Sequence, residues 1–190
     1  MKIEKNKIIT FTGRQVDPFN LQPEDVNIVD IAHSLSQQNR YGGHTFKPYS
    51  VGFHCIMMER TIKNNNNLDI NLDALMHDAS EAYITDIPKP IKKRIPMIEE
   101  IEAKILDVIY QKYGIEHFLN VKEWDQQMVL SEIESFKMLN YLEDRIPEIV
   151  FLHTQNPNHI REIFLNRFNA LTNGKFISET KPYQYLLVSR

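Results

Sequence analysis

Residues 75–91, LMHDASEAYITDIPKPI, combine helical spacing of apolar residues with a His-Asp pair and two prolines. Apolar residues here recur at the spacing of an amphipathic helix: Leu72, Leu75, Met76, Ala79 and Ala82. We therefore predict a helix that runs through His77 and Asp78. Pro88 and Pro90 should end this helix and force an extended DIPKP segment, because the residue before a proline avoids helical conformation.

The rest of the chain predicts further helices joined by polar loops. Glycine and proline mark a loop at 40–50, and NNNN at 64–67 is a polar linker. Period and capping signals predict helices over 23–39, 51–62, 97–113, 121–144 and 157–171. Residues 1–12 and the tail segment YQYLLVS can form a minor strand pairing of the termini. We predict one all-α domain, a helical bundle over 1–190, since strands and helices do not alternate.

Composition excludes several classes of protein. The chain has 190 residues, of which 42% are apolar and 25% charged, as in an ordinary globular protein. A formal charge of −3 gives no basic field for nucleic acid. Cys55 is the single cysteine, so an internal disulfide is excluded. The sequence has neither a signal-like stretch nor 18 consecutive apolar residues, so we expect no membrane contact and a cytoplasmic location.

Imidazole and carboxylate side chains occur in an order that predicts a metal site. Both groups bind first-row divalent metals while leaving open positions. His77 and Asp78 cannot complete a site alone, so ligands must come from other helices. His54 and Asp125 each lie near the predicted start of a helix, beside a loop. The alternative is that the histidines are ordinary core or surface residues and that the His-Asp pair occurs by chance.

The order H…HD…D resembles the HD-domain metal-dependent phosphohydrolases, which are all-helical. HDASEAYITDIPKPIK is similar to the corresponding segment of the YfbR-like 5′-deoxynucleotidase branch. RYGGHTFKPYSVGFHC, GRQVDPFN and VKEWDQQM resemble the small HD phosphohydrolases of bacteriophages, which include the dATP triphosphohydrolases. The resemblance covers roughly residues 10–145.

This resemblance implies a set of metal ligands and catalytic groups. It implies one divalent transition metal (Co, Mn, Zn or Fe, with Mg possible) held by His54, His77, Asp78 and Asp125. It implies that Glu81 and Asp86 lie beside the reactive water, and that Arg40 and Tyr41 lie at the phosphate and nucleoside.

The chain departs from the family pattern next to the first metal ligand. The branch often has Glu or Gln directly before that histidine, whereas Phe53 precedes His54 here. If the polar neighbour orients the imidazole in the family, another group must do so in this chain.

Several residues have the chemistry of substrate contacts. Glu81 follows His77 by one helical turn and, on one continuous helix, would share its face. Arg40 offers a planar donor set that suits phosphate. Cations and ring nitrogens in the flanking loops can also reach a nucleotide: Arg14, His44, Lys89 and Lys92. The alternatives are a solvated surface position for each of them, a solvated helix position for Glu81 and a turn-forming role for Asp86.

The resemblance implies hydrolysis of deoxynucleotides. We expect conversion of dATP to deoxyadenosine and triphosphate, which depletes dATP in a phage whose DNA contains 2-aminoadenine; the protein would then work in the host cytoplasm. The alternatives are a 5′-deoxynucleotidase acting on monophosphates, hydrolysis of a signalling nucleotide such as (p)ppGpp, or a non-catalytic nucleotide-binding module. We also expect a homo-oligomer, a dimer or a hexamer.

Overall fold

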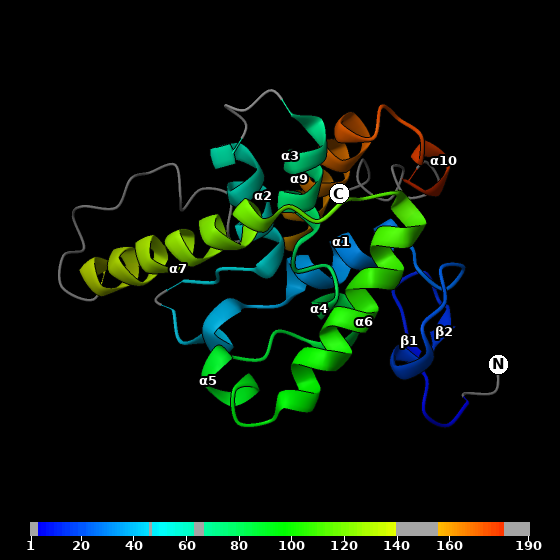
Figure 1. Cartoon of the computed structure of the whole chain (residues 1–190), viewed down its shortest axis with the longest axis horizontal. Helices are drawn as coiled ribbons and strands as arrows, with labels where there is room; N and C mark the ends of the chain where they lie inside the picture. The colour runs from blue at the N-terminus through cyan, green and yellow to red at the C-terminus, as the bar shows by residue number, and fades with distance from the viewer. Residues whose placement is uncertain (1–3, 46, 63–66, 140–155, 181–190) are drawn as a thin grey trace.

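The computed structural model describes residues 4–45, 47–62, 67–139 and 156–180, and it is mostly helical (Figure 1). The helices are α1 (Ile28–Gln37), α2 (Val51–Ile62), α3 (Leu68–Met76), α4 (Glu81–Ile84), α5 (Lys89–Lys92), α6 (Pro96–Tyr113), α7 (Leu119–Leu139), α9 (Pro157–Leu171) and α10 (Ile177–Thr180). Short 3₁₀ helices span Pro18–Asn20 and Arg40–Gly43. The predicted all-α class is confirmed.

The core lies where α9 packs against α1, α2 and α3. Phe164 and Phe168 of α9 are fully buried there, together with Ile31 and Leu35 of α1. Helix α7 extends away from this core and contacts α2 and α3 through its N-terminal half (Figure 1). The first turns of α2, the end of α3 and the first half of α7 therefore lie close together.

The small sheet is a local hairpin. Strand β1 (Ile8–Ile9) pairs antiparallel with β2 (Gln15–Val16), with Ile8 opposite Val16. A minor strand pairing therefore exists, but it joins β1 to β2, in a segment that we predicted as loop, and not the two termini. The turn between the strands closes with Gly13 at φ +84°, a conformation that glycine adopts at little cost. The predicted tail strand YQYLLVS lies outside the described residues.

Three helix boundaries are confirmed, and each has a capping reason. Helix α2 begins after Ser50, whose Oγ accepts a hydrogen bond from Phe53 N at 3.1 Å. Helix α6 ends at Gly114, which has a left-handed φ of +68°. Helix α9 begins after Asn156, whose side chain accepts from Asn158 N at 3.0 Å.

The predicted start of the first helix is wrong by several residues. Pro23 to Asp25 form a turn closed by a hydrogen bond from Asp25 N to Gln22 O, 2.9 Å. The helix begins at Ile28, because the side chain of Asn27 accepts a hydrogen bond from Val29 N at 2.8 Å. A favourable side-chain cap outweighs the proline and acidic residues upstream.

The prediction of one helix through His77 and Asp78 is also wrong. Helix α3 ends at Met76, and residues 77–80 form a turn. Its backbone hydrogen bonds join residues three positions apart, as from Glu81 N to Asp78 O at 3.1 Å. Helix α4 starts at Glu81, so the face that we expected it to share with His77 on one helix does not exist. The segment after Pro88 is the single helical turn α5 and not extended chain.

Gly52 lets α1 and α2 approach closely at the start of α2. A Cβ atom at this position would lie 3.2 Å from the backbone carbonyl of Leu35 and from Ser36 N. We expect Gly52→Ala to lower the free energy of unfolding by about 1–3 kcal/mol, because rigid backbone must move. Denaturant unfolding measures this loss, and Arg60→Ala on the exposed side of α2 is the control. Equal stability of both variants and the wild type would contradict the close packing.

Candidate metal centre

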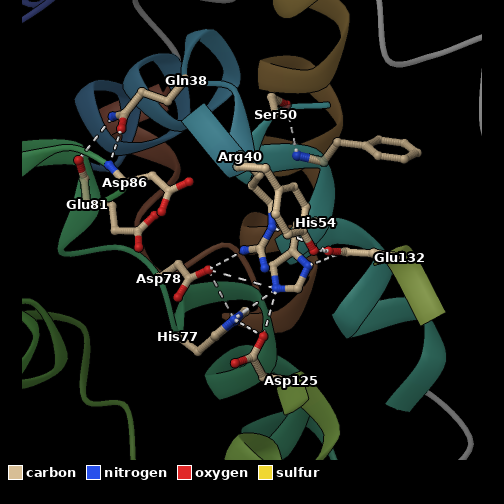
Figure 2. Close-up of polar contacts among 12 residues, drawn as sticks. Gln38, Arg40, Ser50, His54, His77, Asp78, Glu81, Asp86, Asp125 and Glu132 are labelled. Atoms are coloured by element: carbon tan, nitrogen blue, oxygen red, sulfur yellow. Dashed lines mark hydrogen bonds and ion pairs between the residues drawn. The ribbon is translucent and has the colours of Figure 1, made fainter. Parts of the chain in front are cut away.

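The structure brings together all four predicted metal ligands (Figure 2). His54 lies in the first turns of α2 and is fully buried. His77 and Asp78 come from the turn after α3, and Asp125 comes from α7. Because a turn does not separate neighbouring side chains by a fixed helical angle, His77 and Asp78 can both face α2.

The separations between ligand atoms suit a shared cation. His54 Nε2 lies 3.2 Å from His77 Nε2 and 3.2 Å from Asp125 Oδ1. His77 Nε2 lies 3.3 Å from Asp78 Oδ2, and the two remaining nitrogen–oxygen separations are both 3.8 Å. Ligands about 2.1 Å from one ion lie roughly 3.0–3.4 Å apart in octahedral or tetrahedral geometry. His54, His77 and Asp78 each offer an atom within 4.8 Å of the other two, and Asp125 lies beside both imidazoles.

The second nitrogen of each imidazole is already occupied. His54 Nδ1 lies 2.6 Å from Glu132 Oε1, and His77 Nδ1 lies 2.8 Å from Ala74 O. Both partners are acceptors, so each Nδ1 carries hydrogen. The two Nε2 atoms then face each other and the two aspartates, and Arg40 donates to the same Asp78 oxygen. Such a set of nitrogen and oxygen atoms can share a cation, either a proton or a metal ion.

The pKa values show that a proton can take this place. Burial alone lowers the pKa of His77, but Asp78 and Asp125 raise it well above its usual range. Burial raises the pKa of Asp125, yet hydrogen bonds from His54 and His77 hold it far below its usual value. The pKa of Asp78 is also lowered, mainly by His77 against the effect of burial. A metal ion bound here would compete with the proton for the same ring nitrogens.

Arg40 lies against the cluster and is only 9% exposed. Its Nη1 donates to Asp78 Oδ2 at 3.1 Å, and its Nε lies 3.5 Å from Glu132 Oε2. Arg40 therefore neutralises two buried carboxylates. Its predicted contact with phosphate stays a prediction.

The other predicted substrate contacts lie in different surroundings. Tyr41 donates from its hydroxyl to Glu132, which holds it next to Arg40. His44 and Lys89 are exposed. Arg14 Nη1 donates to Glu24 O at 2.6 Å in the segment before α1. Their roles with substrate stay predictions.

Glu81 is buried and pairs with Lys92. Its Oε1 lies 3.2 Å from Lys92 Nζ, and Lys92 also contacts Glu102 at 2.6 Å. Glu81 Oε2 has no hydrogen-bond partner among the described residues. Burial, with Asp78 and Asp86 nearby, raises the pKa of Glu81 well above its usual value. Lys92, which we predicted as a phosphate contact, is therefore engaged by two carboxylates.

Gln38 holds the segment that carries both predicted catalytic acids (Figure 2). Its Nε2 donates to Glu81 O at 3.0 Å, and its Oε1 accepts from Asp86 N at 2.8 Å. Burial raises the pKa of Asp86. The amide of Gln38 therefore fixes Glu81 and Asp86 relative to α1.

Glu132 is a site residue that the sequence analysis missed. It is 6% exposed and contacts His54, Tyr41, Tyr49 and Arg40. Its spacing of seven residues from Asp125 gives two helical turns, which places both on one face of α7. That spacing was a signal that the sequence offered.

The fold and the cluster define an all-α protein with a buried group of two histidines and two aspartates. An Escherichia coli K12 protein named uncharacterized protein YfdR is 34% identical over 174 residues, covering 87% of this chain and 95% of that protein. An uncharacterized protein of Rhodobacter capsulatus is 30% identical over 110 residues, 55% of this chain and 56% of that protein. No family model matches the sequence. The chain belongs to the family of E. coli YfdR.

Among the residues that the structure describes, none of the helices combines the length and the apolar content that crossing a bilayer requires. The cytoplasmic location and the homo-oligomer stay predictions.

Proposed function

We propose that this protein is a metal-dependent phosphohydrolase of the HD type that acts on deoxynucleotides. The observation that carries the proposal is the convergence of two Nε2 atoms and two carboxylate oxygens, from His54, His77, Asp78 and Asp125. With both rings neutral, this is a nitrogen and oxygen donor set that suits a divalent transition metal.

The donor set fits one divalent transition ion. Two imidazole nitrogens and two carboxylate oxygens suit Co, Mn, Zn or Fe, and they suit Mg less well because of the nitrogens. When bound, such an ion would polarise a phosphoryl oxygen and make water a stronger acid. His54, His77, Asp78 and Asp125 would hold the ion and would leave room for water and substrate.

Glu81 is the proposed acceptor of the water proton, and Asp86 is its rival. The raised pKa of Glu81 brings this carboxyl group closer to the pKa that a general base needs near neutral pH. The water oxygen would bond to phosphorus while the bond from phosphorus to the 5′ oxygen breaks. The proton from water would pass through the carboxylate to the departing 5′ oxygen, which leaves the deoxynucleoside with a hydroxyl group.

Two substrates fit this chemistry. Attack at the α-phosphorus of dATP gives deoxyadenosine and triphosphate, and attack on a monophosphate gives a deoxynucleoside and orthophosphate. The triphosphate is supported by the resemblance of the loops to phage enzymes. The ion pairs of Lys92 with Glu81 and Glu102 favour the monophosphate, because they use the charge expected to bind a longer phosphate chain.

Product analysis tests the proposal. Metal-stripped protein is loaded with Co²⁺ or Mn²⁺ and incubated with each dNTP and dNMP, and chromatography identifies triphosphate or orthophosphate. We expect triphosphate from dATP, no turnover with chelator, and no turnover by Asp78→Asn. Asp69→Asn, at the exposed start of α3, is the matched control and should keep activity. Turnover restricted to monophosphates would reject the dATP assignment, and no hydrolysis of any nucleotide would reject the function.

A further inference from the structure

Glu132 contacts both the proposed metal ligand His54 and the segment at 40–50, which precedes α2. It lies in the middle of α7 and is almost completely buried. Its carboxylate accepts from a ring nitrogen and two hydroxyl groups, and a guanidinium nitrogen lies 3.5 Å away. A buried carboxylate with this many donors has one fixed orientation.

The contact with His54 sets the state of that imidazole. The separation of 2.6 Å between Glu132 Oε1 and His54 Nδ1 is that of a charge-assisted hydrogen bond. Such a bond keeps the hydrogen on Nδ1 and increases the basicity of Nε2. The residue directly before His54 is Phe53, which can make no such bond. Glu132 supplies the orienting group that the local sequence lacks.

The remaining contacts tie the same carboxylate to the segment at 40–50. Tyr49 donates to Oε1 at 2.6 Å, Tyr41 donates to Oε2, and Arg40 Nε lies 3.5 Å from Oε2. Tyr41 has a φ of +59°, which a tyrosine adopts only when its surroundings hold it. The two oxygens of Glu132 thus join the metal ligand to a strained turn.

We propose that Glu132 is a positioning residue that fixes His54 as a metal ligand and holds the Arg40–Gly43 turn against the metal centre. This inference rests on the proposed metal-dependent function. Because Asp125 lies on the same face of α7, one helix supplies both a ligand and the group that orients another ligand. The position of α7 therefore sets the geometry of the whole centre.

Titration of the full-length protein with Co²⁺ tests this role, with the visible absorption of bound Co²⁺ as the second readout. We expect Glu132→Gln to weaken Co²⁺ affinity about 10- to 100-fold and to change the absorption bands, as for other residues that orient a ligand. Glu59→Gln is the matched control. Glu59 is a fully buried carboxylate on α2 that pairs with Arg167, and its variant should bind Co²⁺ like the wild type.

A measurement on the unaltered protein covers the case in which Glu132→Gln does not fold. Nitrogen-15 NMR reports which ring nitrogen of His54 carries hydrogen, and it is recorded on the metal-free protein and on the Zn²⁺-loaded protein. We expect hydrogen on Nδ1 in the Zn²⁺ form, with a strongly downfield proton shift. Hydrogen on Nε2, or equal Co²⁺ affinity of Glu132→Gln and wild type, would overturn the role of Glu132. Absence of Co²⁺ and Zn²⁺ binding by the wild type would overturn the proposed function as well.

Discussion

Replacement of His77 by alanine is expected to remove bound Co²⁺ and to lower turnover of the preferred nucleotide by on the order of a thousandfold or more. A divalent ion in the proposed role would contribute several kcal/mol of transition-state stabilisation, and each 1.4 kcal/mol is a factor of ten. His77 Nε2 lies within 3.8 Å of all three other ligand atoms, so its loss opens the cluster on one side. Metal content and initial rates of the purified variant measure the effect.

The same variant separates a metal site from a network of ion pairs. With Co²⁺ at a hundred times its dissociation constant, the wild type should gain about 2.7 kcal/mol of unfolding free energy, and His77→Ala should gain almost none. His117→Ala, which removes an exposed histidine paired with Asp107, is the control and should respond like the wild type. If Co²⁺ left the stability of the wild type unchanged, the cluster would be an ion-pair network.

Arg40→Ala is expected to lower the unfolding free energy of the metal-free protein by about 3–5 kcal/mol. The guanidinium is the buried cation between Asp78 and Glu132. Its removal leaves two buried carboxylates without this balancing charge. Added Co²⁺ should recover part of this loss, because the ion also neutralises Asp78. Denaturant unfolding with and without Co²⁺ measures both values.

Two comparisons control the effect of Arg40. Arg40→Lys keeps the charge but not the planar set of donors, so its loss of stability should be smaller than that of Arg40→Ala. Arg60→Ala removes an exposed arginine from α2 and should change stability little. Metal-free Arg40→Ala as stable as the wild type would show that the guanidinium does not balance the buried carboxylates.

Local signals in the sequence were sufficient for much of the fold. Helices α2, α6 and α9 begin or end where Ser50, Gly114 and Asn156 make short-range capping contacts, which depend on neighbouring residues alone. The break after Met76 was missed because apolar spacing continues through the turn at 77–80. Helical spacing of apolar residues cannot distinguish a continuous helix from one interrupted by a turn that keeps these residues on the same side.

The candidate site was predictable to a different degree. The order of His54, the His77–Asp78 pair and Asp125 identified four residues that do lie close together, because this order resembles that of the ligands in HD-domain metal sites. Glu132 was missed because it contacts His54 across 78 positions of sequence, and only the packing of α7 on α2 brings them together. Lys92 was predicted as a phosphate contact because its partners Glu81 and Glu102 lie 11 and 10 positions away and meet it through the packing of α4 and α5 on α6.

Anomalous diffraction from crystals grown with Co²⁺ tests the central claim most directly. We predict one strong peak within about 2.3 Å of four atoms, His54 Nε2, His77 Nε2, Asp78 Oδ2 and Asp125 Oδ1. Data on both sides of the cobalt absorption edge would identify the element. A fully loaded crystal with no cobalt peak between these four side chains would contradict the claim.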